Sequence, residues 1–343
     1  MIPYILLVIL IFIFRGSKKP FYMFLVLLLF NVLRYDTGWD YMSYVDEVET
    51  WGLPGSNIMR YSFLWQWLFA FAQKVNMPHL AIAVPGFLTI CIVYFAVVRL
   101  TQTKAEACDA LTFYALWPYF FLGSFSTIRQ SLGVAIGLLI LLSALKRKYL
   151  WFVILLVLNI LIHPSSIMCI FYAAFFLPDF KLKFWHMVLL IVGLFIALAS
   201  IDLIIQNSPL ASYEVYLNST DSYGSKLSIL LAIILIPTLM VRKQKLGNSG
   251  ITDVCILALI LLIITYVALD NSVISRVADY YVILMIFVAP TYKFLFQDRA
   301  LGNVLVIGGF TALFFYYLLS TQGAVQQGLA TSPFVPYQWI FLH

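Results

Sequence analysis

The 343-residue sequence is poor in charge: Asp, Glu, Lys and Arg together make up 10 % of it, against about 25 % in a soluble globular protein. Hydrophobic residues make up 63 %, and the mean hydropathy is +0.97. This shortage of polar surface excludes a soluble globular domain, a disordered chain and a collagen-like chain. The composition is that of a polytopic, all-α membrane protein.

Motifs for metal, nucleotide and serine-hydrolase chemistry are also missing. The 4 cysteines form no C-x-x-C pair, and the 4 histidines show no metal-ligand spacing. A Gly-rich phosphate loop, H-E-x-x-H and G-x-S-x-G are absent from the sequence. We therefore predict neither a cofactor nor a metal, and no ATP-driven chemistry.

Apolar runs separated by short polar breaks divide the chain. Because backbone groups in lipid must bond internally, runs this apolar predict helices. The first run lacks the basic region and cleavage site of a signal peptide, so we expect it to be retained as a span. We predict about twelve transmembrane helices in one integral membrane domain, 1–343, from the runs Ile2–Phe14, Phe21–Leu33, Leu80–Val98, Ala110–Leu122, Ile128–Leu145, Tyr149–Ile162, Ser165–Leu177, Trp185–Ile205, Leu227–Val241, Val254–Leu269, Val277–Phe296 and Leu301–Ser320.

Basic residues gather in alternate breaks between these runs. An excess of Lys and Arg marks the cytoplasmic side, so the N-terminus is predicted to lie outside the cell membrane. The net charge of +6 then reflects topology and gives no sign of a nucleic-acid partner. The residues on the predicted cytoplasmic side are Arg15, Lys18, Lys19, Arg99, Lys104, Lys146, Arg147, Lys148, Lys181, Lys183, Arg242, Lys243, Lys245, Lys293 and Arg299.

Two outward segments are longer than the other breaks. Segment 34–79 contains the amphipathic stretch Ile58–Lys74, whose Trp65 and Trp67 suit a helix lying at the membrane surface. Segment 206–225 carries three tyrosines and is expected to form an outer lid. The remaining basic residues also fall on the outer side: Arg34, Arg60, Lys74, Arg129, Lys226 and Arg276.

The densest polar cluster is 34–41, directly after the second run. It contains Arg34, Gly38, Asp40 and Tyr41, and Tyr44 follows. One interpretation is a charged rim that caps a helix end. The other is a sugar or phosphate site, in which aromatic rings stack on sugars, carboxylates accept hydroxyl protons and Gly38 permits a tight turn.

Arg129 lies at the outer end of the fifth run. Gly133 and Gly137 follow at i+4 and i+8 on the same helical face. Small-residue packing beneath an interfacial arginine is one explanation. The alternative is a guanidinium that clamps a phosphate, which its planar fork suits, with a groove for an acyl chain beside the glycines.

His163 and Arg276 complete the set of candidates. His163, followed by Pro164-Ser165-Ser166, is either a helix cap or a proton carrier, because its ordinary pKa lies near neutrality. Arg276 either pairs locally with Asp279 at i+3 or shares a ligand with Tyr280 at i+4.

Three segments together resemble the EpsG-like group of Wzy polysaccharide polymerases. They are Gly38-x-Asp40-Tyr41-x-x-Tyr44, the block from Ile128-Arg129-Gln130-Ser131-Leu132 to Ile160-Leu161-Ile162-His163-Pro164-Ser165-Ser166, and Ser275-Arg276-Val277-Ala278-Asp279-Tyr280-Tyr281. The match spans roughly residues 30–285. Where family members often show a Glu-Pro-Gly-Phe-like stretch, this chain has Arg60-Tyr61-Ser62-Phe63.

The resemblance implies a bacterial inner-membrane polymerase of O-antigen or capsule repeat units, with its active site facing the periplasm. Such enzymes transfer a growing glycan from one undecaprenyl diphosphate carrier to the sugar of another lipid-linked repeat unit, without metal or nucleotide sugar. The expected partners are that lipid-linked oligosaccharide, the lipid bilayer and a chain-length regulator protein.

The hypothesis is therefore glycosyl transfer at the outer membrane surface. Arg129, Arg276 and Arg34 would bind the departing diphosphate, and His163 or Asp40 would act as the base. The other residues expected to bind substrate are Tyr41, Tyr44, Gly38, Tyr280 and Gly133. Two rival classes stay open, a flippase or transporter of lipid-linked oligosaccharide and a membrane acyltransferase that modifies exported glycans.

Overall fold

The computed structural model describes residues 1–53, 61–177, 224–246, 248–264, 272–326 and 334–342. The chain forms two compact units. The first comprises Met1–Phe176 and Asn303–His343, and the second comprises Leu177–Gly302. The sequence predicts one membrane domain, which stays a prediction, and each unit is described by itself below.

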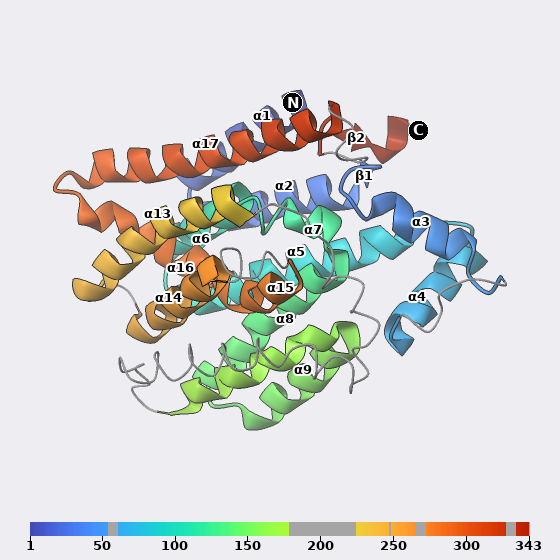
Figure 1. Cartoon of the computed structure of the whole chain (residues 1–343), viewed down its shortest axis with the longest axis horizontal. Helices are drawn as coiled ribbons and strands as arrows, with labels where there is room; N and C mark the ends of the chain where they lie inside the picture. The colour runs from blue at the N-terminus through green and yellow to red at the C-terminus, as the bar shows by residue number, and fades with distance from the viewer. Residues whose placement is uncertain (54–60, 178–223, 247, 265–271, 327–333, 343) are drawn as a thin grey trace. The chain divides into compact units, whose positions relative to one another are not determined.

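The first unit consists mainly of helices, which are named by the labels of Figure 1. Two of these helices are only about one turn long: α7 is an α-helix, and η6, at the C-terminal end, is a 3-10 helix. The elements are α1 (Ile2–Gly16), α2 (Pro20–Val32), β1 (Arg34–Tyr35), α3 (Tyr41–Glu49), α4 (Phe63–Lys74), α5 (Leu80–Leu100), α6 (Lys104–Leu116), α7 (Gly123–Ser126), α8 (Ile128–Leu145), α9 (Tyr149–Ile162), η2 (Pro164–Phe176), α17 (Arg299–Gln326), β2 (Gln338–Trp339) and η6 (Ile340–Leu342).

Helix α8 forms the centre of this unit. It packs against α5, α9 and η2, and α5 packs in turn against α2. The side chain of Asn159 in α9 donates a hydrogen bond to the Gly133 carbonyl of α8 at 2.9 Å. Gly133 and Gly137 are both buried, so the glycine face of α8 serves close helix packing in this structure.

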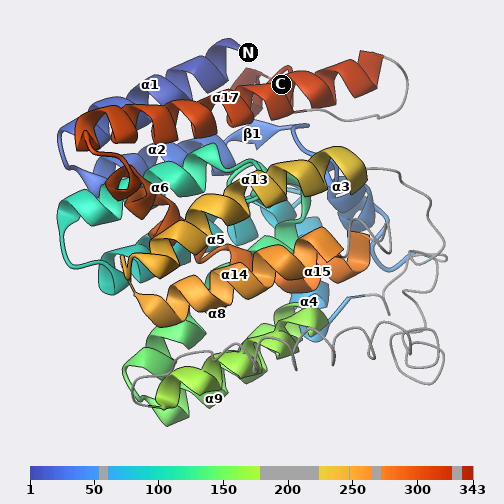
Figure 2. The same ribbon diagram turned by 60° about the vertical axis from the view of Figure 1, so that its left-hand side comes forward.

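The two ends of the chain meet in the first unit. α1 and α17 lie side by side in both views (Figures 1 and 2), and Tyr4 of α1 donates to the Phe334 carbonyl at 2.6 Å. β2 pairs with β1 in an antiparallel ladder that sets Arg34 opposite Trp339. This two-stranded sheet is an addition to the all-α fold that the sequence predicts, and it anchors the C-terminal segment beside the polar cluster 34–41.

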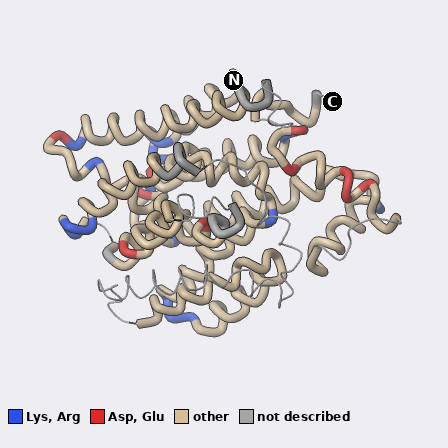
Figure 3. The backbone as a smooth tube through the Cα atoms, in the orientation of Figure 1, with Lys and Arg blue, Asp and Glu red and all other residues tan. Residues whose placement is uncertain are grey.

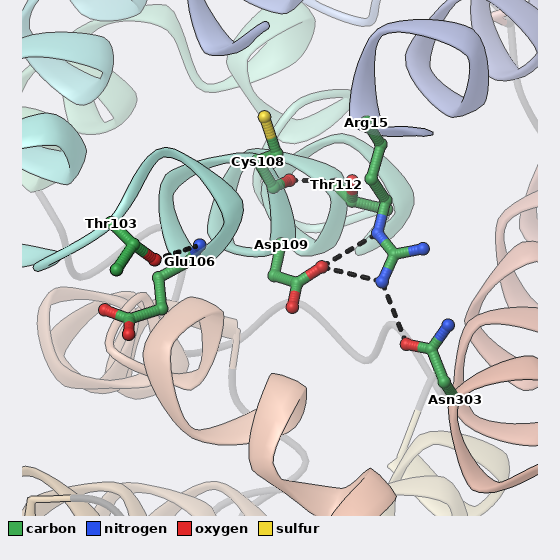
Figure 4. Close-up of polar contacts among 7 residues, drawn as sticks. All are labelled: Arg15, Thr103, Glu106, Cys108, Asp109, Thr112 and Asn303. Atoms are coloured by element: carbon green, nitrogen blue, oxygen red, sulfur yellow. Dashed lines mark hydrogen bonds and ion pairs between the residues drawn. The ribbon is translucent and has the colours of Figure 1, made fainter. Parts of the chain in front are cut away.

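Helix α6 begins earlier than hydropathy indicates. The Thr103 hydroxyl accepts a hydrogen bond from Glu106 N at 3.2 Å (Figure 4), which satisfies one of the amides that a helix start leaves open. The helix therefore starts at Lys104 and ends at Leu116, whereas the sequence predicts a run over Ala110–Leu122. Because its first turns carry charged residues, a hydropathy pattern does not detect where the helix begins.

An ion pair joins three helices of the first unit. Arg15 Nε donates to Asp109 Oδ1 at 2.8 Å, and Arg15 Nη2 donates to Asn303 Oδ1 at 2.8 Å (Figure 4). These contacts connect α1, α6 and α17. Figure 3 shows the acidic residues of α3 at one end of this unit, away from the basic turns between α1 and α2 and between α8 and α9.

The second unit contains α13 (Gly224–Lys243), α14 (Ser249–Ile264), α15 (Ser272–Val282), α16 (Met285–Val288) and η5 (Ala289–Leu295). α14 packs against α13 and α15. Arg242 and Asp253 form an ion pair within the α13–α14 hairpin, and Thr238 and Tyr292 hydroxyls lie 2.6 Å apart.

Among the described residues, four segments are long and apolar enough to cross a membrane: Leu80–Leu100, Ile128–Leu145, Val277–Leu295 and Arg299–Gln322. Shorter apolar helices cover several other predicted runs, although Ser165–Leu177 forms a 3-10 helix and Val277–Phe296 is divided among α15, α16 and η5. The chain is therefore a mostly helical membrane protein. The number of twelve spans stays a prediction, and Trp185–Ile205 and the expected lid at 206–223 lie outside the described residues.

Candidate functional site

Arg34 is buried at the end of α2 and makes contacts with the protein itself. Its Nη1 donates to Asn31 Oδ1 at 2.8 Å and to the Asn31 carbonyl, and its Nη2 donates to the Phe125 carbonyl at 3.5 Å. The guanidinium carbon also lies 4.6 Å from the centre of the Phe125 ring. Burial lowers the pKa of Arg34 to about 10, so the side chain stays charged at neutral pH.

Small residues make room for this arginine. A Cβ on Gly86 would lie 3.2 Å from Asn31 Cγ and still closer to Asn31 Oδ1. Asn31 Nδ2 in turn donates to Ser124 Oγ at 2.7 Å. Gly86 of α5 therefore permits the asparagine to bind both Arg34 and the segment before α8.

Gly38 lets the polar cluster approach that same segment. Its φ is +106°, a conformation that L-residues rarely adopt, and a Cβ there would lie 2.7 Å from the Phe125 carbonyl carbon. The next residue, Trp39, donates its backbone N–H to Ser126 Oγ at 3.0 Å. The cluster thus packs on the turn that leads directly into α8 and Arg129.

Tyr41 and Asp36 place polar atoms in the interior of this cluster. Within the described part of the chain, Tyr41 OH and Asp36 Oδ1 are buried without a hydrogen-bond partner. Burial raises the pKa of Tyr41 to about 12. Asp40, which precedes α3 as its N-cap, is half-buried and close enough for its charge to raise the pKa of Tyr44.

Arg129 is brought to this cluster by the first turn of α8. Its Nε donates to Tyr44 OH at 3.0 Å, and its guanidinium carbon lies 4.7 Å from the centre of the Tyr61 ring. Burial is the main cause that raises the pKa of Tyr44, so its phenol stays neutral. The two tyrosines orient the guanidinium by a hydrogen bond and a cation–π contact without neutralising its charge.

An aromatic cluster from α3 and α4 holds both tyrosines. Tyr44 packs edge-on against Trp65 at 6.0 Å and Phe69 at 5.8 Å, and Tyr61 packs on Phe69 at 4.8 Å. Trp65 and Phe69 are therefore buried on one face of α4, whereas Trp67 is 63 % exposed on the other. A helix is present at Phe63–Lys74, within the stretch Ile58–Lys74, and its location at the membrane surface stays a prediction. Of its two tryptophans, Trp67 is the exposed one.

His163 is the C-cap of α9, and the residue before it contacts the same aromatic cluster. Trp65 Nε1 donates to the carbonyl of Ile162, the residue before it, at 3.0 Å. His163 Nδ1 lies 2.7 Å from Ser165 Oγ. His163 is buried, with 6 % of its surface exposed.

The structure thus brings Arg34, Gly38, Asp40, Tyr41, Tyr44, Arg129, Gly133 and His163 into the first unit. Arg276 and Tyr280 belong to α15 of the second unit, where Tyr280 is buried. Arg60 lies outside the described residues. In the described ranges, no group of three or more His, Cys, Asp or Glu side chains could hold a metal ion.

Several contact residues are not predicted by the sequence pattern. In the sequence, Tyr61 and Trp65 stand out for their aromatic character, and nothing there marks Tyr61 as a contact of Arg129 or Trp65 as a hydrogen-bond donor to Ile162. Asn31 and Asn159 do carry a usable signal, because an amide within an apolar run is costly unless it finds a hydrogen-bond partner. Asn31 binds Arg34, and Asn159 binds α8.

A family comparison covers nearly all of this chain. The model of the EpsG family matches residues 20–339, a range that includes every candidate residue above. No curated protein and no solved structure matches the chain.

Proposed function

The chain belongs to the EpsG family, and we propose that it is a polysaccharide polymerase that acts on lipid-linked repeat units. In this proposal a growing glycan passes from one undecaprenyl diphosphate carrier to a sugar of a second lipid-linked unit. The transferase needs neither metal nor nucleotide sugar. The chain lies in a bacterial inner membrane, and its active site faces the periplasm, in agreement with the distribution of basic residues.

The observation that carries the proposal is the setting of Arg129. Tyr44 and Tyr61 orient this half-buried cation through contacts with neutral side chains, and an oriented guanidinium is suited to bind a diphosphate. The diphosphate gains negative charge as its bond to the sugar breaks. A preoriented guanidinium stabilises this transition state more than the ground state, which lowers the barrier.

The acceptor hydroxyl requires a base, for which His163 and Asp40 are the candidates. The hydroxyl oxygen attacks the anomeric carbon of the donor sugar, the bond from that carbon to the diphosphate oxygen breaks, and the diphosphate leaves with the electron pair. The hydroxyl proton passes to the base. If His163 Nδ1–H donates to Ser165 Oγ, the lone pair of Nε2 is the proton acceptor.

The other residues have supporting roles. Arg34 holds the cluster 34–41 together through Asn31 and Phe125, and contact with the diphosphate would require it to exchange those bonds. Tyr41, Gly38 and Gly133 would shape the substrate site. Arg276 is proposed to bind diphosphate and Tyr280 to bind substrate, and a chain-length regulator is a proposed partner.

The test uses purified protein in lipid vesicles with a defined lipid-linked repeat unit as the sole substrate. Longer glycans on the lipid carrier, formed equally with and without a chelator, support a metal-independent polymerase. Movement of the unit across the bilayer without elongation would instead indicate a transporter. A requirement for an acyl donor would indicate an acyltransferase.

The matched variants are Arg129→Ala and Lys74→Ala. Arg129→Ala should nearly abolish elongation while the protein still inserts, since the diphosphate loses its cation. Lys74 lies in the last turn of α4, so its loss should leave elongation unchanged. Full-length glycans from Arg129→Ala would refute the assignment.

A further inference from the structure

We infer that Trp65 is a positioning residue that fixes Arg129 and His163 relative to one another, and that Asn159 provides a second connection between the helices that carry them. The inference rests on the proposed function, in which Arg129 binds the diphosphate and His163 takes the proton. Neither Trp65 nor Asn159 is assigned contact with substrate.

Trp65 contacts a neighbour of each candidate catalytic residue: Tyr44, which binds Arg129, and Ile162, which precedes His163. The edge-on contact of its ring with Tyr44 supports the hydroxyl that accepts from Arg129 Nε. Its indole N–H donates to the Ile162 carbonyl, one peptide bond before His163. With 3 % of its surface exposed, Trp65 is enclosed by these contacts, and its hydrogen bond is directed at the end of α9.

Asn159 makes the second connection, through hydrogen bonds to both helices. It lies four positions before His163, whose backbone N–H donates to the Asn159 carbonyl at 2.9 Å. Its side-chain amide donates to the Gly133 carbonyl, four positions after Arg129, at 2.9 Å. One fully buried asparagine therefore joins the last turn of α9 to the first turns of α8.

Two separate connections between the helices restrict how far Arg129 and His163 can move apart. The proposed reaction requires the cation at the leaving diphosphate and the base at the attacking hydroxyl in the same step. A displacement of about 1 Å can slow an enzyme by about 100-fold even when every reacting group is present. Loss of either connection should therefore lower kcat more than it raises KM.

The central experiment compares Trp65→Phe with Trp67→Phe in the vesicle assay. Both substitutions are made on α4 and remove one indole, but Trp67 lies on the exposed face. We expect Trp65→Phe to lower kcat by about 10- to 100-fold, with KM within about twofold of the parent. Trp67→Phe should match the parent in both.

A pH profile separates a positioning role from a loss of folded protein. A rate that depends on His163 as base should rise with pH through the imidazole pKa, and His163→Ala should remove that rise. Trp65→Phe should flatten the same rise. A loss of folded protein would instead lower the rate by the same factor at every pH. Asn159→Leu, which keeps the volume but loses the donor, should act in the same direction and decides the question if Trp65→Phe does not fold.

The outcomes distinguish the inference from the function beneath it. If His163→Ala is inactive and Trp65→Phe and Asn159→Leu both behave like Trp67→Phe, the positioning role is wrong and the proposed function stands. If His163→Ala elongates glycans normally, His163 is not the base, and the inference fails with that assignment. If every variant except Trp67→Phe is slowed in kcat, the inference is supported.

Discussion

Replacing Gly38 by alanine should destabilise the protein by an amount that the structure allows us to separate into two parts. The first part is the backbone, because a φ of +106° costs an L-residue about 1–3 kcal/mol. The second is a clash, because the new Cβ would lie 2.7 Å from the Phe125 carbonyl carbon. A backbone carbonyl cannot rotate away as a side chain can, so we add about 1–3 kcal/mol for overpacking. Gly38→Ala should then lower the free energy of unfolding by about 2–6 kcal/mol.

Two other glycines provide matched controls for these parts. Gly52 also has a positive φ, +78°, but no atom lies within 4 Å of the position that a Cβ would take, so Gly52→Ala should show the backbone cost alone. Gly309 lies in α17 with open space around it, so Gly309→Ala should stabilise by about 1 kcal/mol. Denaturation of the three purified variants in detergent measures the differences.

The decisive comparison is between Gly38→Ala and Gly52→Ala. If the two lose the same free energy of unfolding, the contact between Gly38 and the Phe125 backbone has no energetic weight and the packing of cluster 34–41 on the start of α8 is wrong. If Gly38→Ala loses clearly more free energy of unfolding than Gly52→Ala, its elongation rate should fall as well. Displacement of cluster 34–41 would also displace Tyr44, which follows it and accepts the hydrogen bond from Arg129.

Three further predictions concern single polar contacts. Tyr44→Phe keeps the ring but removes the acceptor of Arg129 Nε; a hydrogen bond to a charged group contributes about 1.5–3 kcal/mol, so kcat/KM for elongation should fall by about 10- to 100-fold. Burial raises the pKa of Tyr41 to about 12. The stability that its neutral phenol contributes is therefore complete below pH 10 and is lost as the pH rises through 12. In a denaturation series over that pH interval, Tyr41→Phe should lose less stability than the parent protein. Asp109→Asn breaks a partly buried pair with Arg15 and should cost about 1–3 kcal/mol in thermal unfolding, while the elongation rate per folded molecule stays unchanged.

The helices of the first unit show what hydropathy can predict. α8 and α9 begin and end at the residues that the sequence predicts, because the basic turn at 146–148 bounds both runs. α6 does not, because its first turns carry Lys104, Glu106 and Asp109 and begin at a capping threonine. A hydropathy average falls where these charged residues occur, but it takes no account of the hydrogen bonds and ion pairs that satisfy them in the folded protein.

The site was predictable in its residue types and not in its contacts. Arg129, Tyr44 and His163 stand out in the sequence because charges and hydroxyls are rare in so apolar a chain. The hydrogen bond from Arg129 to Tyr44 joins residues 85 positions apart, and β1 pairs with a segment near residue 338. No local pattern encodes either pairing, since both depend on how α3, α4 and the C-terminal segment pack.

The contacts of Arg15, Arg34 and Arg129 indicate which of them is the strongest candidate to bind a ligand. Arg15 meets the carboxylate of Asp109, which offsets its charge within the protein and suits a structural role. Arg34 is enclosed, with both terminal nitrogens on carbonyl or amide oxygens of its own unit. Arg129 is half-buried, and Tyr44 and Tyr61 fix its direction while they leave its charge intact. A guanidinium oriented by two aromatic side chains can meet a diphosphate in a fixed geometry, which is why Arg129 is the residue whose loss we expect to end elongation.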